Sequence, residues 1–139
     1  MLQFLLDTDQ LTLYDHLHPL VRNHVAAQGS GVVGLPLVAV EEYLRGRLAR
    51  VARAKDGIAR TTHYALFLDS LQLAQRFPIA PFDQAAEDQY QLLRGMRLRI
   101  GTQDQKIAAI ALATNVILVT RNKSDFGQIP GLVLDDWSV

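Results

Sequence analysis

The pattern of apolar and polar residues is clearest between residues 98 and 125. Residues 107–113 are apolar on almost every side of a helix, which predicts a helix that is buried all round. Thr102 and Gln105 have the spacing of a capping box, so we expect this helix to begin at about Gln103.

The segment that follows this helix predicts a buried strand. Asn115 suits the turn that ends the helix, and residues 116–119 form a continuous apolar run, as in a strand covered on both faces. Polar residues occupy positions 120–125 immediately afterwards. A buried helix, a buried strand and then a polar cluster indicate an α/β fold, in which functional groups gather at the carboxyl ends of the strands.

The rest of the chain alternates between short apolar runs and apolar residues at helical spacing. The short runs predict four more strands, at residues 3–6, 32–35, 79–82 and 132–134, the last at an edge of the sheet. The helical spacing predicts a helical stretch through residues 13–25 and helices over about 38–53, 62–77 and 83–98. Pro19 should divide the first of these helices, and either Thr8 or Asp9 could cap it. We therefore expect three α/β/α layers around a mainly parallel sheet of about five strands.

The glycines at 29, 31 and 34 match the spacing G-x-G-x-x-G. A dinucleotide-binding motif of this form follows a strand and opens a helix. Here it follows a helical pattern and leads into a predicted strand, so we interpret the glycines as a turn and not as a cofactor site.

Length and composition limit the class of protein. The chain has 139 residues, which is enough for one domain, and we expect a single domain over residues 1–139. It has no cysteine, which excludes disulfides and thiolate metal sites and fits a reducing cytoplasm. We expect no membrane association, because no apolar run approaches the length of a membrane span and the N-terminus lacks a signal-peptide pattern.

The formal net charge is zero, but the basic residues are clustered. One group follows the predicted second strand and consists of Arg45, Arg47, Arg50, Arg53, Lys55 and Arg60. Two smaller groups are Arg94, Arg97, Arg99 and Lys106, and then Arg121 and Lys123. Such groups are often only solvated helix faces. Beside an acidic pocket, they could also contact the phosphates of a nucleic acid.

Four carboxylates share a position at the ends of predicted strands or the beginnings of predicted helices. They are Asp7, Glu42, Asp104 and Asp125. In a parallel sheet these positions converge on one edge, where grouped carboxylates repel one another and need a cation to ionise together. Oxygen ligands without cysteine favour Mg²⁺ or Mn²⁺ over zinc. Such an ion activates water and neutralises charge on a phosphoryl transition state.

Each of these acids also has a purely structural interpretation. Asp7 could cap a helix or form a turn, Glu42 and Asp104 could complement helix dipoles, and Asp125 could cap a turn. Glu41 and Glu42 cannot both point toward the site from one helix. The recurrence of acids at equivalent ends favours a common site. The four histidines lack metal-ligand spacing, and we interpret them as surface or packing residues.

Several segments resemble the PIN-domain ribonucleases, and among them the VapC-like toxins of bacterial toxin–antitoxin pairs. The matching segments, in order along almost the whole chain, are LLDTD, VEEYLRG, IGTQDQKIAAIAL, ILVTRNKSDF and the closing GLVLDDW. The resemblance implies a Rossmann-like PIN fold and a metal-dependent endoribonuclease that hydrolyses RNA phosphodiester bonds. It places the acids of the family at Asp7, Glu42 and Asp104. Glu42 is preferred to Glu41 because its distance to Gly46 matches the family spacing E-x-x-x-G.

The resemblance further implies one or two Mg²⁺ ions, a homodimer and a cognate antitoxin that covers the site. The fourth acidic position is open, since many members carry Asp where this chain has Asn122 and others use the acid before the Phe, here Asp125. Asp9 replaces an Asn or Ser common in the family. Thr8 and Thr120 are expected to support the site through hydrogen bonds.

Two other functions are compatible with parts of the sequence. The Asn122 departure allows a PIN-fold module that binds RNA or protein with little or no catalysis. Asp7-x-Asp9 after a strand also loosely resembles haloacid-dehalogenase-type phosphatases, in which Asp7 would be the nucleophile. That alternative leaves Glu42 and Asp104 without a role, so a metal-dependent ribonuclease is the prediction that uses most of the residues.

Overall fold

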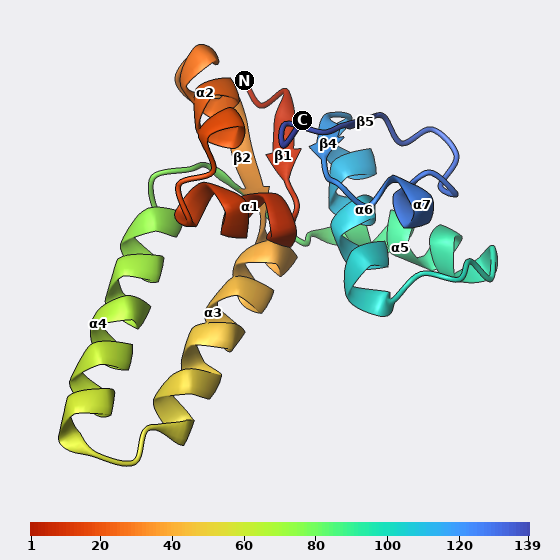
Figure 1. Cartoon of the computed structure of the whole chain (residues 1–139). Helices are drawn as coiled ribbons and strands as arrows, with labels where there is room; N and C mark the ends of the chain where they lie inside the picture. Colours follow the sequence, from red (N-terminus) through yellow and green to blue (C-terminus); the bar gives the residue numbers. More distant parts are fainter.

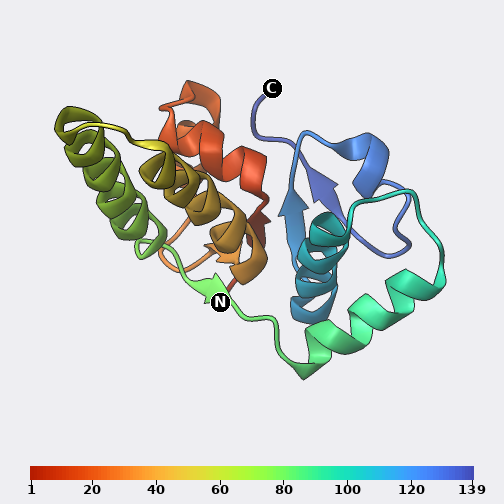
Figure 2. The ribbon, with the colours of Figure 1, turned by 90° about the horizontal axis from the view of Figure 1, so that it is seen from below.

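The computed structural model describes residues 1–139 as a five-stranded sheet with helices on both faces (Figures 1 and 2). All four strand pairs are parallel, and the strand order is β3-β2-β1-β4-β5. The strands are β1 (Phe4–Leu6), β2 (Val33–Pro36), β3 (Ile79–Ala80), β4 (Ile117–Val119) and β5 (Leu134–Asp135). The prediction of a three-layer α/β/α fold with about five strands, β5 at an edge, is confirmed.

Seven helices connect and follow the strands. They are α1 (Thr8–Asp15), α2 (Pro19–Ala27), α3 (Leu37–Arg53), α4 (Gly57–Ala74), α5 (Gln84–Gly95), α6 (Thr102–Thr114) and α7 (Lys123–Phe126). Pro19 separates α1 from α2 as predicted, because it cannot continue the hydrogen bonding of the preceding turn. None of the helices is both long and apolar enough to cross a membrane.

Two apolar clusters hold the helices against the sheet. One packs α5 and α6 against one face and contains Leu5, Leu118 and Ile107, all fully buried. The other packs α1, α2 and α4 against the opposite face and contains Leu6 and Trp137. Alternate residues of β1 therefore enter opposite clusters, as the two-residue period of a strand requires. Because both faces are covered, the strands are the continuous apolar runs that the sequence shows.

The strand order places a topological switch point between β1 and β4. The chain passes outward from β1 through β2 to β3 and then returns to the other side of β1 with β4. Ligand sites in open parallel sheets form at this point, at the carboxyl ends of the strands. The segments after β1 and β4 begin with Asp7 and Thr120, and the backbone N–H of Asp7 donates to the Val119 carbonyl at 3.0 Å.

The helix α6 begins differently from the prediction. Gly101 is its N-cap residue, and no side chain caps it, so the predicted capping box of Thr102 and Gln105 is wrong. Thr102 is already helical, and the Gln105 amide instead donates to the Ile100 carbonyl at 2.8 Å. The predicted end of this helix is correct: Asn115 has a left-handed conformation (φ 56°) that stops it.

Three other local features differ from the sequence expectation. Asp7, and neither Thr8 nor Asp9, caps α1. The helix α4 begins at Gly57, five residues before the predicted Thr62, because Asp56 caps it by accepting from the Ala59 N–H. Gly29 and Gly31 lie in the predicted turn, but Gly34 is in β2, where a side chain would collide with the Pro78 carbonyl.

The helices α3 and α4 form a long antiparallel pair whose far ends extend away from the sheet (Figure 1). The first turns of α3 lie beside α1 and α6 and contribute to both apolar clusters, through Val38 on one side and Val40 on the other. The N-terminal half of α3 is therefore fixed at the switch point, while its C-terminal half is mostly exposed to solvent.

Candidate active site

Asp7 is the most deeply buried acid of the predicted site. It follows β1 directly and its Oδ1 accepts the Gln10 N–H at 2.8 Å, so the same side chain caps α1 and faces the switch point. Burial raises the pKa of Asp7 from 3.8 to about 6. Hydrogen bonds from Thr120 and from the Gln10 backbone oppose this rise, whereas the charges of Asp9 and Asp104 add to it.

Glu42 reaches the site from the second turn of α3. Its Oε1 accepts a hydrogen bond from the Thr8 hydroxyl at 2.5 Å, which ties α3 to the first residue of α1. The neighbouring Glu41 points elsewhere: it is exposed, forms an ion pair with Arg45 at 2.5 Å and accepts from the Gln103 amide. The structure thus separates the two glutamates, as their positions on a helix require.

Asp104 lies in the first turn of α6, half-buried and facing the acids of other segments. Burial raises its pKa, and the charges of Glu42 and Asp125 raise it further. No basic group contributes to the shift. Asp104 is therefore close enough to two other predicted acids to be repelled by them, and no cation of the chain compensates it.

Asp125 lies in α7 and is held by Asn122. The Asn122 amide Nδ2 donates to Asp125 Oδ2 at 3.0 Å, while its Oδ1 accepts the Asp125 N–H and so caps the helix. The Asn122 N–H in turn donates to the Thr120 hydroxyl at 2.9 Å. Asn122 is thus engaged in orienting Asp125 and the loop after β4.

The charges of the four acids repel one another in pairs, but the side chains do not form a closed cluster. Asp7 is repelled by Asp104, and Asp104 by Glu42 and Asp125. No three acidic or histidine side chains lie close enough together to hold one metal ion in the geometry described. The arrangement is an open group of carboxylates near the end of β1, each held by a hydrogen-bond donor or by its helix.

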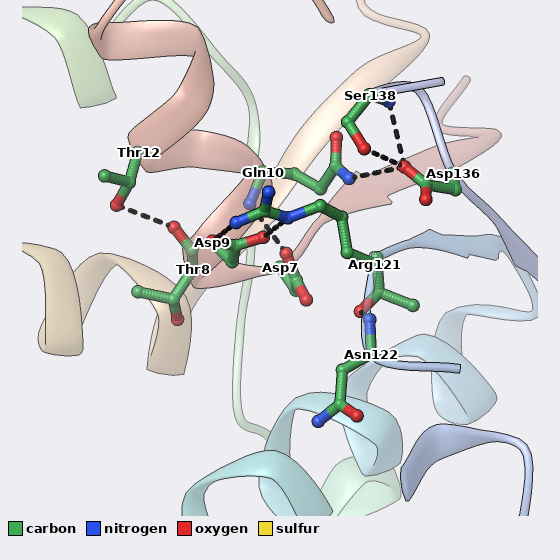
Figure 3. Close-up of polar contacts among 10 residues, drawn as sticks. Asp7, Thr8, Asp9, Gln10, Thr12, Arg121, Asn122, Asp136 and Ser138 are labelled. Carbon is green, nitrogen blue, oxygen red and sulfur yellow. Dashed lines mark hydrogen bonds and ion pairs between the residues drawn. The ribbon is translucent and has the colours of Figure 1, made fainter. Parts of the chain in front are cut away.

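Two polar pairs at the site were not predicted (Figure 3). Arg121 donates from Nε and from one terminal nitrogen to the two carboxylate oxygens of Asp9, at 2.7 and 2.9 Å. Gln10, which is fully buried, donates to Asp136 at 3.1 Å. These pairs bring the loop after β4 and the C-terminal segment against α1. Their partners are more than a hundred residues apart, so no local pattern could reveal them.

Several of the clustered basic residues form ion pairs with acidic side chains. Arg45 pairs with Glu41 and Arg121 with Asp9, while Arg47 pairs with Asp15 at 3.0 Å. The remaining basic residues form no ion pair, and those of α3 beyond Arg47 are exposed. Among the histidines, His24 stacks on Trp137, with ring centroids 5.3 Å apart, and His18 caps α2.

The donor set fits a hard divalent cation. The four side chains supply only oxygen, which Mg²⁺ prefers. The raised pKa values of Asp7 and Asp104 have the same physical cause, namely burial, which penalises the ionised form, together with repulsion by nearby acids. A bound cation would remove that cause by stabilising the ionised forms.

Comparison with known proteins relates the chain to bacterial VapC proteins. No family model matches the chain. Ribonuclease VapC2 of Rickettsia felis is 48% identical over 40 residues, a match that spans 29% of this chain and 30% of that protein.

Solved structures match over nearly the full length. A chain in the VapBC2 complex of Rickettsia felis, crystallised with a fragment of promoter DNA, is 26% identical, with a TM-score of 0.72 and 99% of both chains covered. A chain in the DNA-bound VapBC complex of Salmonella typhimurium has a TM-score of 0.77 at 22% identity, again over 99% of both chains, and this second match shows the fold. The chain thus has the fold of the VapBC chains that it matches, and a 40-residue segment of it is similar in sequence to a protein named Ribonuclease VapC2.

Proposed function

We propose that this chain is a metal-dependent endoribonuclease and the toxin of a toxin–antitoxin pair. The observation that carries the proposal is the open group of Asp7, Glu42, Asp104 and Asp125 near the switch point of a PIN-like sheet. The likeness to a protein named a ribonuclease and to a chain of a VapBC complex supports the same function. Grouped carboxylates that lack a cationic partner are poor binders of RNA on their own, so the proposal includes a metal ion.

Mg²⁺, or Mn²⁺, would be held by Asp7 and Asp104 together with Glu42 and Asp125, whose side chains would draw closer together than they lie in the structure. When bound, the ion would lower the pKa of the attacking water and neutralise charge on the phosphate. The chain's own contribution is to fix these oxygens. The Gln10 N–H and Thr120 hold Asp7, and the helix α6 carries Asp104.

The remaining two acids are each oriented by one neighbouring side chain. The Thr8 hydroxyl occupies one lone pair of Glu42 and leaves the carboxylate facing the switch point. The Asn122 amide does the same for Asp125. In this arrangement Asp125, and not the Asn122 position, supplies the fourth carboxylate, and Asn122 acts as a positioning residue.

The proposed partners rest on the likeness to a chain of a VapBC complex. We propose RNA as the substrate, a cognate antitoxin as the inhibitor and a homodimer as the working form. The complexes formed by related VapC chains support an antitoxin partner. A PIN-fold module that binds RNA without cutting it is the alternative to be excluded by experiment.

Cleavage of a pool of total RNA tests the function. The purified chain is incubated with the pool in Mg²⁺, in Mn²⁺ or in chelator, beside Asp104→Asn prepared identically. We expect discrete fragments with 3′-hydroxyl and 5′-phosphate ends from the unaltered chain with metal, and none from the variant or in chelator. Cleavage that survives both the chelator and the substitution would contradict the proposal. RNA retained but uncut under every metal would favour the binding module.

A further inference from the structure

The surface of α3 carries two hollows that meet beside the candidate active site. One lies between α3 and α1, has a volume of about 230 Å³ and is lined by Thr8, Glu42, Gly46, Arg47 and Arg50, among others. The second lies on the other flank of α3, with Glu42, Gly46 and Gln103 in its lining, and has a volume of about 320 Å³. Enclosed sites for small molecules measure roughly 300–1,000 Å³. The first hollow is below this range, the second is at its lower end, and polar or charged residues make up most of the lining of both. They suit part of an extended chain better than an enclosed ligand.

Gly46 lies where the two hollows adjoin. It lies one helical turn beyond Glu42 and lines both of them. A Cβ atom built at this position meets nothing within 4 Å, so no packing requirement of the fold explains the glycine. Glycine also weakens a helix interior. Its position, between a proposed ligand and a row of arginines, leaves open the space that a side chain would fill.

The wall of the first hollow is rigid. The Arg47 guanidinium is held by Asp15 at 3.0 Å and by the Ser70 hydroxyl at 2.9 Å, which joins α3 to α1 and α4. Because Asp15 is neutralised by Arg47, it does not oppose an anionic ligand in the hollow. The free positive charge of this hollow is Arg50, which is exposed and forms no ion pair.

The positive charge continues from Arg50 toward the end of the α3–α4 pair. Arg50 also lines a third hollow, together with Arg53 and Lys55, at the turn between the two helices. Neither Arg53 nor Lys55 forms an ion pair. Glu42 therefore lies near the N-terminal end of α3, and the unpaired basic residues begin at Arg50 and continue past the C-terminal end of the same helix. The rise from Glu42 to Arg50 is about 12 Å at 1.5 Å per residue.

From this arrangement we infer that α3 carries a groove for single-stranded RNA, which begins at Glu42, crosses Gly46 and continues past Arg50 to Arg53 and Lys55. This inference rests on the proposed ribonuclease function. The phosphate to be cut lies at the acidic end, and the phosphates on one side of it follow the arginines. A length of about 12 Å accommodates roughly three nucleotides at the 3.4 Å rise of a stacked strand. The contacts that we infer are to phosphates, so the groove adds affinity and not sequence preference.

Binding and cleavage are measured separately, so that the groove and the nuclease can fail independently. Binding is followed by the fluorescence anisotropy of a labelled oligoribonucleotide in chelator at low salt, where no metal-dependent cleavage occurs. The chains compared are the unaltered protein, Gly46→Gln, Arg50→Ala and the control Arg76→Ala. Arg76 is an exposed arginine without an ion pair at the opposite end of α4, and it lines none of the hollows.

Gly46→Gln is the sharpest of these variants. It should melt at the same temperature or higher, because glutamine is a better helix former than glycine and meets no neighbour. We expect it nevertheless to bind RNA about tenfold more weakly, as the side chain fills the groove. Arg50→Ala should lose about fivefold and make the slope of log K against log salt shallower by about 0.7, the value for one phosphate contact on a single strand. Arg76→Ala should bind like the unaltered chain.

The outcomes are distinct. Equal binding by all four chains, an equal loss in Arg76→Ala, or no RNA binding by the unaltered chain would overturn the groove. If the unaltered chain binds no RNA, the surface of α3 would instead be a candidate site for a protein partner. Cleavage of the same oligonucleotide in Mg²⁺ is scored in parallel. Loss of binding in Gly46→Gln and Arg50→Ala, with no cleavage by any chain, would support the groove and contradict the proposed nuclease.

Discussion

The Thr8 hydroxyl donates a hydrogen bond to Glu42 Oε1 at 2.5 Å, which joins the first residue of α1 to the second turn of α3. Thr8 follows Asp7 directly, so a single dipeptide supplies one acid of the site and fixes another. Glu42 projects from a helix that is largely exposed beyond this point, and Thr8 is its hydrogen-bond partner within the chain.

Replacing Thr8 with Val should therefore impair activity more than folding. The variant keeps the shape of the side chain but leaves Glu42 without its donor. A hydrogen bond to a charged group contributes roughly 1.5–3 kcal/mol, and the lower end applies to this half-buried pair. We expect metal-dependent cleavage to fall about tenfold, with the melting temperature nearly unchanged. Thr8→Ser, which retains the hydroxyl, should restore most of the rate; equal loss in both variants would contradict the positioning role.

Asp7→Asn should stabilise the metal-free protein at neutral pH. The folded state raises the pKa of Asp7 from 3.8 to about 6, so folding favours the protonated acid. This stabilisation is complete below pH 3.8 and is lost as the pH rises through about 6. The shift corresponds to a cost of up to about 3 kcal/mol for the ionised side chain at pH 7.5. The asparagine avoids that cost and keeps the oxygen that caps α1.

Urea unfolding in chelator checks the effect of Asp7→Asn. The difference in free energy of unfolding between the variant and the unaltered chain should be small at pH 4 and rise to about 1–3 kcal/mol at pH 7.5. The matched control is Asp83→Asn, another helix N-cap aspartate, which is exposed and lies at the start of α5 away from the site. A constant difference across the pH range would show that Asp7 is not destabilised by ionisation.

Mg²⁺ should stabilise the folded chain, and more strongly at pH 7.5 than at pH 5. Protons and metal compete for the same carboxylates, because a ligand must be deprotonated to coordinate. At an ion concentration of a hundred times the dissociation constant, binding to the folded state alone contributes about 2.7 kcal/mol. Thermal melts with and without Mg²⁺ measure the shift. Asp104→Asn should remove most of it, whereas an unchanged shift in that variant would place the ion elsewhere.

Asn122 separates two roles that one substitution can distinguish. Its Oδ1 caps α7 and its Nδ2 orients Asp125. Asn122→Ser keeps an oxygen for the cap but provides no amide for Asp125, so stability should hold while cleavage falls severalfold. Asn122→Ala should lose activity similarly and also about 1 kcal/mol of stability, since it removes the cap. If Asp125→Asn leaves the rate unchanged while both Asn122 variants reduce it, the fourth metal ligand is at Asn122 and our assignment is wrong.

The sequence predicted well those elements in which the pattern of apolar residues matches the faces that are buried in the structure. Strands β1 and β4 are covered on both faces, so their apolar runs are unambiguous, and Asn115 ends α6 in the conformation that its side chain tolerates. The four acids could be proposed because parallel strands align their carboxyl ends. Their common location could thus be argued from their positions at strand ends and helix starts.

The features that the sequence could not predict depend on tertiary contacts. The capping box at Thr102 is wrong because Gly101 takes the N-cap position and Gln105 finds a better acceptor in the Ile100 carbonyl. The bidentate pair of Arg121 and Asp9 joins residues 112 positions apart, which meet only once β1 and β4 are neighbours. Local propensity carries no information about either choice.

The measurement that tests the central claim most directly is the initial rate of RNA cleavage as a function of Mg²⁺ concentration, for the unaltered chain, Asp7→Asn and Asp104→Asn, with Asp83→Asn as the control. All four chains are first shown to be folded at the assay temperature. We predict a rate that saturates with Mg²⁺ in the unaltered chain and the control, and that falls at least a hundredfold in the two site variants. Equal rates in all four chains, or a rate independent of Mg²⁺, would contradict a carboxylate-bound metal as the centre of this site.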